Sequence, residues 1–426
     1  MKSLLPYLIL VLLALTLIAL PSTAQKLSPE EQKILSYVDA HKEDAIALLE
    51  KVVNIESPTQ NVAGVKQVGV ILKSEFDALG FKTKWIEMPA EMKRGGHLVA
   101  ERTGTKGKKL LLLGHLDTVL SGEKFRREGR RAFGTGTSDM KAGDVVMLYA
   151  LKALHNAGLL KDTQIVVMYT GDEEDSGEPV ETSRGDMLAL AKRSDLTLSF
   201  EGAVRNTATV GRRGSSSWTL EVTGETGHSS GIFGERMGNG AIFEAARIIH
   251  QFHEQLRGEK YLTFNPSVIV GGTQAEMNTF NGTASGKTNV VPAKVIVKGD
   301  LRFISEEQKE ATRAKMREIV AKHLPKTNAK ITFEDGIPAM TPNEGNYALL
   351  KQLDQVSQDL GFGKVEALDP GERGAGDIAF ISHLIPGLDG LGAKGGNSHA
   401  AGEWTDLESM PMLIKRTAVL IYRLTR

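Results

Sequence analysis

Three short apolar runs in the first half of the chain end directly in a histidine or an acid, at residues 109–113, 164–170 and 195–200. Runs of this length and composition are typical of strands buried on both faces of a parallel sheet. In an open α/β sheet, sites are built at the carboxyl ends of the strands. The pattern therefore predicts an α/β fold in which acidic and imidazole side chains converge on one sheet edge.

Five segments carry these and related side chains: GHLDTV (114–119), GTSDMKAG (136–143), GDEE (171–174), SFEGA (199–203) and NSHAAGEW (397–404). Two divalent cations about 3.5–4 Å apart can bind one hydroxide between them and polarise a carbonyl. Such a site needs a carboxylate that bridges both cations, together with a terminal carboxylate and often an imidazole for each. The five segments contain this set, and they predict a two-metal hydrolase.

Asp139 is the predicted bridge, because a glycine-bounded loop just ahead of a helix leaves both of its oxygens free. His115 and Glu201 would complete the ligands of one cation, and Glu174 and His399 those of the other. Three carboxylates and a hydroxide balance the charge of two dications. A neutral cluster of this kind is much easier to bury than a charged one.

Two further acids have positional roles. Asp117 lies two residues after His115, on the same side of an extended chain, and could accept the other imidazole N–H, which would fix the tautomer. Glu173 adjoins Glu174 but should point away from its cation. A free carboxylate at that place is the natural general base, which takes a proton from water and later gives it to the leaving amine.

The first 24 residues have the pattern of a targeting segment. Lys2 precedes an apolar run over residues 4–20, which is short for a membrane span of about 20 residues, and small residues suited to cleavage follow at 22–24. We expect a cleaved signal peptide, and a secreted or periplasmic protein with no stable membrane association after cleavage. The alternative is an uncleaved N-terminal anchor.

The composition narrows the function further. The chain has no cysteine, so neither disulfides nor thiolate ligands contribute. Without the first 24 residues it carries 51 basic and 52 acidic side chains, a balance that offers no electrostatic footprint for nucleic acid. About 400 mature residues exceed one ordinary core, so we expect two domains.

The order of helical and strand patterns predicts a small domain inserted in a larger one. Residues 25–208 and 339–426 alternate helices, expected near 30–54, 64–79 and 142–157, with strands, which predicts a catalytic domain with a mainly parallel sheet. Residues 209–338 follow the β-α-β-β-α-β order of a ferredoxin-like α+β motif, with helices near 239–256 and 306–323. Hinges near Thr209 and Pro338 would join the two domains.

The motifs GHLDTV, GTGTSDMKAG, GDEE and SHAAGEW, in this order, resemble those of the co-catalytic zinc aminoacylase and glutamate carboxypeptidase family (metallopeptidase family 20), across essentially the whole mature sequence. The resemblance implies a zinc-exopeptidase-like catalytic domain with an inserted lid and dimerisation domain. It also implies zinc ligation by the five residues named above and a cis peptide bond between Asp139 and Met140. Glutamate rather than aspartate at Glu201 is most similar to the carboxypeptidase branch.

The resemblance also implies roles for the inserted domain. His228, in TGHSSG, resembles a histidine that completes an oxyanion site and that family dimers can supply from the partner subunit, so we expect a homodimer through this domain. Asn289 and Arg302 match positions that bind substrate carbonyl and carboxylate groups, and an arginine fork suits a free carboxylate. The implied substrates are small peptides and N-acyl amino acids. Two Zn²⁺ ions are expected, although carboxylate and imidazole ligands also serve Co²⁺ and Mn²⁺.

The sequence thus predicts a metallohydrolase, either a carboxypeptidase or an N-acyl-amino-acid amidohydrolase, that cleaves an amide next to a free C-terminal carboxylate. The predicted chemistry is attack by a metal-bridged hydroxide with Glu173 as general base. One alternative is an α/β serine hydrolase with Ser229, Asp377 and His399 as its triad, but residues 232–238 contain two glycines where the elbow requires a helix. The other is a non-catalytic binding protein on the same fold, which would be expected to have lost a ligand or Glu173.

Overall fold

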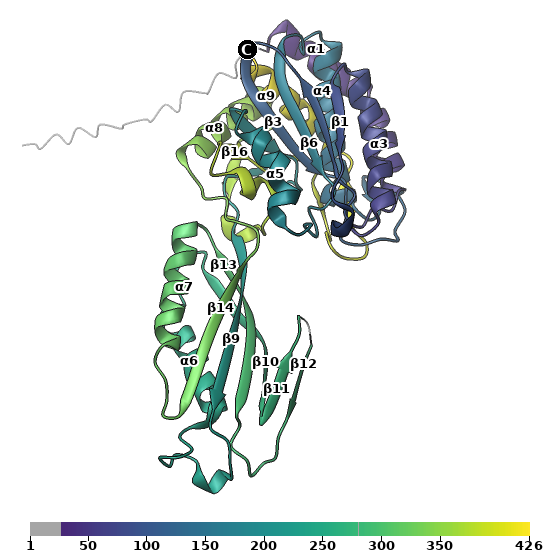
Figure 1. Ribbon diagram of the computed structural model, residues 1–426. Coiled ribbons are helices and arrows are strands. Elements are labelled where there is room, and N and C mark those ends of the chain that lie inside the picture. Colours follow the sequence, from purple (N-terminus) through teal and green to yellow (C-terminus); the bar gives the residue numbers. More distant parts are fainter. Residues whose placement is uncertain (1–26, 280) are drawn as a thin grey trace, which may run out of the picture.

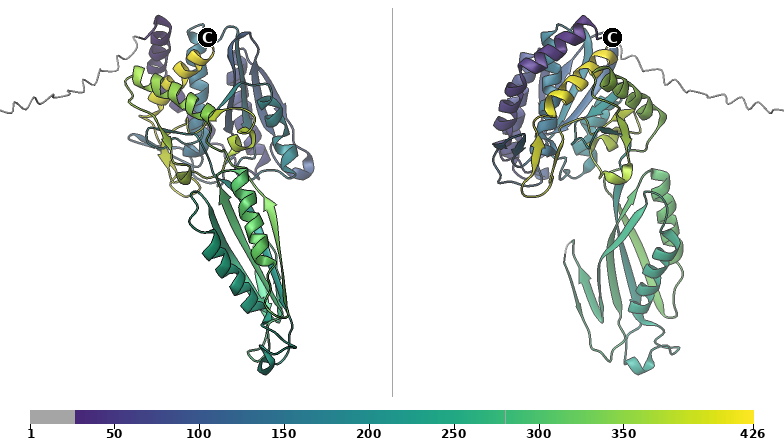
Figure 2. Two further views of the ribbon diagram at one scale, coloured as in Figure 1. Left: turned by 90° about the vertical axis from the view of Figure 1, so that its left-hand side faces the viewer. Right: turned by 180° about the vertical axis from the view of Figure 1, so that it is seen from behind.

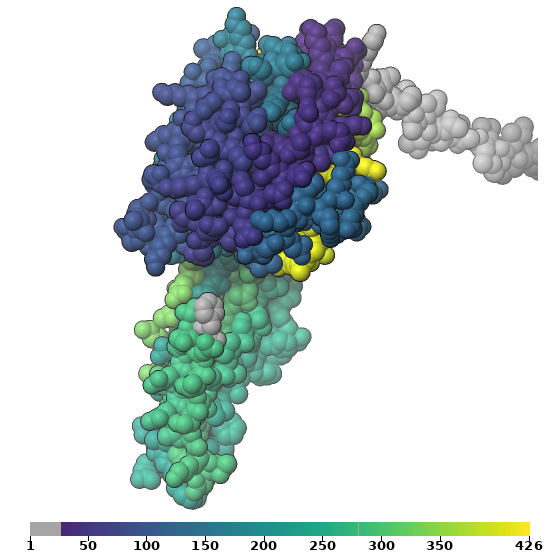
Figure 3. All heavy atoms as spheres, turned by 90° about the vertical axis from the view of Figure 1, so that its right-hand side faces the viewer, coloured from purple at the N-terminus to yellow at the C-terminus, as the bar shows by residue number. Residues whose placement is uncertain are grey.

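The computed structural model describes residues 27–279 and 281–426, so the targeting segment expected at residues 1–24 lies outside the described residues. The chain forms a large α/β body and a smaller, elongated body built from the inserted residues (Figure 1). The smaller body extends away from the larger one in all three views of the ribbon (Figures 1 and 2) and in the space-filling view (Figure 3). None of the helices in the described ranges combines the length and apolar character that crossing a membrane requires.

A six-stranded sheet forms the centre of the large body, in the order β1-β2-β6-β3-β7-β16. Its strands are β1 (Lys82–Ile86), β2 (His97–Arg102), β3 (Lys106–His115), β6 (Thr163–Thr170), β7 (Leu196–Ser199) and β16 (Gly387–Leu388). Parallel pairing joins β6 to β3, β3 to β7 and β7 to β16, whereas β2 runs against both of its neighbours. The predicted mainly parallel sheet is confirmed.

Alternate residues of β3 pack into two different layers. Leu110 and Leu112 belong to one core, whereas Leu111 and Leu113 face the opposite side. The first core contains α1 (Pro29–Ala40), α2 (Lys42–Val53), α3 (Val62–Ala78), α4 (Ala142–Asn156), α8 (Glu344–Asp359) and α9 (Met410–Leu424). The second contains α5 (Val180–Ala191) and the 3₁₀ turn η5 (Asp377–Ile381). Coverage of both faces explains why β3 is a continuous apolar run.

The helix expected near residues 30–54 is two helices, because His41 interrupts it. Its backbone (φ −117°, ψ 20°) ends α1 and begins α2. The imidazole stacks on the ring of Tyr37 at 3.9 Å, and Nδ1 lies 2.8 Å from the Tyr37 carbonyl oxygen. These local side-chain contacts hold a break that apolar periodicity alone did not indicate.

The inserted residues form an antiparallel sheet in the order β10-β13-β9-β14. Its elements are β9 (Gly214–Gly224), α6 (Gly240–Leu256), β10 (Thr263–Gly272), β13 (Lys294–Phe303), α7 (Glu306–Val320) and β14 (Thr327–Asp335). Both helices pack on one face, over a core that includes Trp218 and Val297. The element order is the ferredoxin-like one. A hairpin of β11 (Gln274–Met277) and β12 (Gly282–Ser285), which sequence patterns did not predict, lies between β10 and β13 in the chain.

Two small sheets bring distant segments beside the central sheet. One has the order β17-β18-β5-β4, with β4 (Arg126–Glu128), β5 (Arg131–Phe133), β17 (Gly395–Gly396) and β18 (Trp404–Asp406). The other pairs β8 (Thr207–Thr209) with β15 (Glu366–Leu368). The first sheet places the NSHAAGEW segment next to the loop that precedes α4, so two of the five predicted segments meet there.

Candidate metal centre

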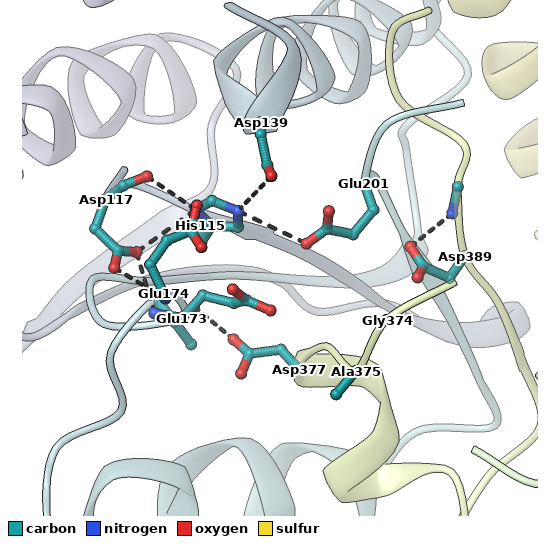
Figure 4. A network of polar contacts seen from close by, with 12 residues as sticks. His115, Asp117, Asp139, Glu173, Glu174, Glu201, Gly374, Ala375, Asp377 and Asp389 are labelled. Atoms are coloured by element: carbon teal, nitrogen blue, oxygen red, sulfur yellow. Dashed lines mark hydrogen bonds and ion pairs between the residues drawn. The ribbon is translucent and has the colours of Figure 1, made fainter. Parts of the chain in front are cut away.

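The carboxyl ends of β6, β3 and β7 bring a histidine and several acids together. His115 is the last residue of β3, Glu173 and Glu174 lie in the turn after β6, and Glu201 lies two residues after β7. Because these strands are parallel neighbours, the four side chains lie at one sheet edge. Figure 4 shows them gathered around His115 together with Asp139.

Asp139 lies between two histidines. It belongs to the turn η2 (Thr137–Lys141) ahead of α4, where its backbone is not helical (φ −129°, ψ 93°), and its peptide bond to Met140 is cis, as the resemblance implied. Oδ1 lies 3.3 Å from Nε2 of His115, and Oδ2 lies 3.0 Å from Nε2 of His399. The two oxygens of one carboxylate thus face different imidazoles, which is the arrangement that a bridging ligand needs.

Three overlapping groups of ligand atoms surround this carboxylate, each with its atoms within 4.8 Å of one another: His115, Asp139 and Glu201; Asp139, Glu174 and His399; His115, Glu173 and Glu174. The first two groups share Asp139 and contain the ligands expected for the two cations. Oε2 of Glu174 also lies 3.2 Å from Nε2 of His399. This contact favours Glu174 over Glu173 as the ligand.

Asp117 holds the neighbouring acids more directly than it holds His115. Nδ1 of His115 lies 3.0 Å from the main-chain oxygen of Asp117 and 3.5 Å from its carboxylate, so the main-chain oxygen is the nearer acceptor for the ring N–H. The buried carboxylate instead accepts the N–H of Glu173 at 3.1 Å and of Glu174 at 3.2 Å, and the hydroxyl of Thr59 at 2.6 Å. Asp117 therefore fixes the GDEE turn as well as the histidine.

Burial and charge repulsion act on these carboxyl groups. Burial raises the pKa of Glu173 well above its usual value, and the charge of Glu201 raises it further. Burial also raises the pKa of Glu174, and burial together with Asp139 raises the pKa of Glu201 to about 7. Burial acts in the same direction on Asp139, but hydrogen bonds from the two histidines outweigh it and lower the pKa of Asp139. Hydrogen bonds to Asp139 and Glu174 raise the pKa of His399 to about 10.

This donor set fits divalent cations. Buried carboxylates crowd one another, and Oε1 of Glu174 is buried without a hydrogen-bond partner in the described structure. Uncompensated buried charge is costly, and a dication beside it removes the cost. Carboxylate oxygens and imidazole nitrogens suit Zn²⁺, Co²⁺ and Mn²⁺ alike.

A cavity of about 240 Å³ opens beside the carboxylates and is also lined by Arg212 and Arg373. The guanidinium of Arg212 already has protein partners: its Nε donates to Asp389, and its Nη2 lies 3.8 Å from Glu201. The guanidinium of Arg373 is less well paired. Its Nε and Nη2 are buried without a hydrogen-bond partner among the residues described, and its nearest carboxylate, Asp389, is 3.9 Å away. Neither arginine belongs to a motif that sequence reasoning selected.

A buried ion-pair network holds Asp172, the first acid of the GDEE turn. Arg184 of α5 donates from Nη1 to Asp172 at 2.6 Å and from Nε to Asp377 at 2.7 Å. Asp377 also accepts the hydroxyl of Thr170 at 2.6 Å. The network ties the end of β6 to α5 and η5. No local pattern predicted Arg184, which lies in a helix with no motif of its own.

Glu403 is another residue that sequence reasoning missed. It lies four residues after His399, and its buried carboxylate accepts backbone N–H groups of Gly136, Ser138 and Asp139. The signal available in the sequence was an acid inside the NSHAAGEW segment itself.

The three residues expected to bind substrate from the inserted domain separate into two places. His228 begins the turn η3 (Ser229–Gly231) beyond β9, and the main-chain oxygen of Asn289 accepts the N–H of Ser229 at 2.9 Å. Arg302 is at the other end of β13, opposite Ser215, with Nε 3.1 Å from Asp300. A strand of this length spans about 30 Å. The end of β9 and the start of β13, next to which His228 and Asn289 lie in the chain, are at the end of the inserted domain remote from the large body (Figure 1).

The same separation argues against the serine-hydrolase alternative. Ser229 lies beside His228 at that remote end. Asp377 is engaged by Arg184, and His399 by Asp139 and Glu174. The three residues of the proposed triad do not meet.

Comparison with known proteins agrees with the site. Residues 111–423 match the sequence profile of Peptidase family M20/M25/M40. Carboxypeptidase G2 of Pseudomonas sp. (strain RS-16) is 29% identical over 388 residues, which cover 88% of each chain. A succinyl-diaminopimelate desuccinylase of Acidovorax ebreus (strain TPSY) is 25% identical over 400 residues, 87% of this chain and 96% of that one.

Solved structures share the fold. Aminopeptidase PepT from Bacillus cereus superposes with a TM-score of 0.72 at 20% identity, covering 90% of this chain and 99% of that one. A Bacillus subtilis protein described as a dinuclear metal binding peptidase from the M20 family has a TM-score of 0.64 at 14% identity, covering 91% and 99%. The profile match spans most of the chain and confirms the resemblance drawn from the motifs. The chain belongs to Peptidase family M20/M25/M40, and it is a metallopeptidase or amidohydrolase of that family.

Proposed function

We propose that the chain binds two divalent cations, most simply Zn²⁺, through His115, Asp139, Glu174, Glu201 and His399, and hydrolyses an amide or peptide bond next to a free carboxylate. The observation that carries the proposal is the position of Asp139, whose two oxygens face His115 and His399 at 3.3 and 3.0 Å. When bound, two cations would supply Lewis acidity and would lower the pKa of a bound water molecule towards neutrality.

Glu173 is the general base of this proposal. Its carboxylate lies within 4.8 Å of ligand atoms of His115 and Glu174 and lines the cavity beside them. Within residues 27–279 and 281–426 this carboxylate accepts no hydrogen bond, so it is free to take a proton from the attacking water and to deliver it to the leaving nitrogen. Asp117 orients it by accepting the N–H of Glu173 itself.

Two arginine side chains are candidates for binding the free carboxylate of the substrate. Arg302 belongs to the inserted domain and is partly committed to Asp300. Arg373 lines the cavity with buried guanidinium nitrogens that have no hydrogen-bond partner in the described residues, so an anionic substrate group would satisfy them. The names carboxypeptidase and desuccinylase among the relatives support an amide bond flanked by carboxylates as the scissile bond.

A homodimer through the inserted domain completes the proposal. Exposed apolar side chains gather on this domain: Phe233, Ile242, Phe243, Val268 and Ile269. Phe233 and Phe243 are in ring contact, and Ile242 lies against Gly271 of β10, so helix and edge strand present one patch. Because His228 is remote from its own carboxylates, it would complete the oxyanion site of a second copy. The protein so assembled would be secreted or periplasmic, after removal of residues 1–24.

The test uses purified residues 25–426, metal analysis and a panel of dipeptides and N-acyl amino acids, each paired with its C-terminal amide as control. We expect about two Zn²⁺ per chain, and hydrolysis of free acids but not of the matched amides. Chelation should abolish activity and added Zn²⁺ should restore it. Full activity after exhaustive chelation, with loss on a serine-directed reagent, would contradict the proposal.

A further inference from the structure

A buried carboxylate holds the backbone of the turn that carries Asp139. Glu403 is 5% exposed. Its Oε2 accepts the N–H of Gly136 at 2.7 Å, while its Oε1 accepts the N–H of Ser138 at 2.7 Å and of Asp139 at 2.8 Å. All three donors come from the glycine-bounded turn before α4. One side chain, from a segment more than 260 residues away, therefore fixes three backbone positions.

Glu403 does not need these bonds to hold its own strand. Its main-chain oxygen already accepts the N–H of Gly134 at 3.1 Å, and the residue after it, Trp404, pairs with Phe133 in the antiparallel β18–β5 ladder. Its backbone is thus anchored independently of its carboxylate. The hydrogen bonds of its carboxylate therefore stabilise the turn at residues 136–139 rather than its own strand.

The chain on the other side of Glu403 carries His399. The connecting loop contains two non-glycine residues at positive φ, Asn397 (58°) and His399 (62°), a conformation that side chains disfavour. The loop returns to Glu403 through Gly402, whose N–H donates to Oε1 of Glu123 at 2.9 Å. Glu403 therefore ties together the two segments that supply Asp139 and His399.

We propose that Glu403 is a positioning residue of the metal centre, which sets the direction in which Asp139 presents its two oxygens and so sets the affinity for both cations. The inference rests on the proposed function, because it assumes that Asp139 is the shared ligand. The backbone of η2 is not helical at Asp139 and Met140, so helical hydrogen bonding does not fix the direction of the Asp139 side chain. Ligands must be held to within roughly 0.5 Å for productive geometry.

The residue type follows from the number of donors. Three N–H groups converge on two oxygens, and both oxygens of a carboxylate accept, with charge-assisted strength. A glutamine has one accepting oxygen, and its NH₂ group would face a backbone N–H. Glu403→Gln therefore preserves volume while releasing part of the turn. Glu403→Asp keeps the charge but withdraws it by one methylene.

The experiment titrates Zn²⁺ into metal-free protein by calorimetry with a competing chelator, and follows thermal unfolding of the same samples. Glu31→Gln is the matched control, because Glu31 is also 5% exposed and also accepts a backbone N–H, that of Ser28 at 2.8 Å, in α1 away from the strand ends. We expect Glu403→Gln and Glu403→Asp to weaken Zn²⁺ binding about 10–100-fold, as loss of a ligand's supporting partner does. Glu31→Gln should leave it unchanged.

The outcomes separate the two hypotheses. If wild-type protein fails to bind two Zn²⁺ ions, the proposed function itself is wrong. If wild-type protein binds them and both Glu403 variants bind equally well, with only a lower unfolding temperature, the carboxylate serves the fold and the inference is overturned. Failure of both variants to fold would overturn it in the same way. Weakened Zn²⁺ binding, with unfolding no lower than in Glu31→Gln, supports it.

Discussion

Replacing each glutamate of the GDEE turn in separate variants distinguishes the ligand from the base. In the structure, Oε2 of Glu174 lies 3.2 Å from Nε2 of His399. Glu174, Asp139 and His399 together form one of the groups of possible metal ligands. The carboxylate of Glu173 accepts no hydrogen bond within the described ranges. The two side chains are adjacent in the chain and equal in chemistry, so Glu173→Gln and Glu174→Gln are matched controls for each other.

Glu173→Gln should mainly lower kcat/KM, whereas Glu174→Gln should mainly lower the affinity for Zn²⁺. Glu173→Gln loses no hydrogen bond from the described residues and buries no charge, so its metal-free form should unfold no lower than metal-free wild type. With Zn²⁺ supplied, the variant should retain both cations. Loss of a general base lowers kcat/KM by roughly 10²–10⁴, which is about 2.7–5.4 kcal/mol of transition-state stabilisation. Glu174→Gln removes a ligand, and its Zn²⁺ affinity should fall by more than the roughly 10–100-fold that loss of an outer partner costs.

The assay combines Zn²⁺ content after dialysis with kcat/KM on one substrate at saturating and at limiting Zn²⁺. Glu174→Gln should regain part of its activity as Zn²⁺ rises, whereas Glu173→Gln should not. If Glu173→Gln loses its metal and Glu174→Gln keeps it, the two roles are exchanged. If Glu173→Gln keeps metal and full activity, the base has been assigned to the wrong residue.

Three other predictions concern the support of the site and the inserted domain. Asp117→Asn leaves one backbone N–H of the GDEE turn without its acceptor, so urea unfolding should show a loss of about 1–3 kcal/mol; an unchanged midpoint would contradict this role. His228→Ala and Glu173→Gln chains, each impaired alone, should recover about a quarter of wild-type activity when mixed and re-associated, since half of the dimers would hold one intact site; no recovery would refute action in trans. Burial opposes ionisation of Glu244, but its hydrogen bonds with Arg247 prevail and lower its pKa. The stability that the ionised side chain contributes is therefore present above the unfolded-state pKa of about 4.3 and is lost as the pH falls through the lower pKa of the folded state. Glu244→Gln should therefore lower the unfolding midpoint at pH 7 and converge with wild type at acidic pH, and an equal loss at both would contradict the linkage.

The strand-end positions were predictable because an apolar run of the right length reveals both a buried strand and where it stops. His115 and Glu201 follow from this rule alone, and the common sheet edge follows from parallel pairing. Asp139 needed only its glycine-bounded turn. The family is confirmed and the mainly parallel sheet is confirmed, both from patterns that extend over a few residues.

What escaped prediction depends on contacts between segments far apart in the chain. Glu403 acts on a turn more than 260 residues away, and Arg184 joins acids at 172 and 377, so no local window contains either relation. The hairpin β11–β12 lies in a stretch rich in glycine, threonine and asparagine, where strand patterns are weak. The carboxylate of Asp117 lies 3.5 Å from His115, and it also accepts the backbone N–H groups of Glu173 and Glu174, a contact that no local pattern indicated.

The segments that meet at Asp139 are also separated in time. His399 follows Asp139 by 260 residues, with the whole inserted domain between them. At a synthesis rate of about 5–20 residues per second, roughly 13–50 s pass before the ribosome adds the second histidine. Until then the sheet edge has His115 and its acids but neither His399 nor the carboxylate of Glu403. Any part of the sheet that forms during synthesis therefore forms before the ligand set is complete. A product truncated ahead of residue 399 would also lack α9 and would carry a cluster of acids that it cannot fully neutralise.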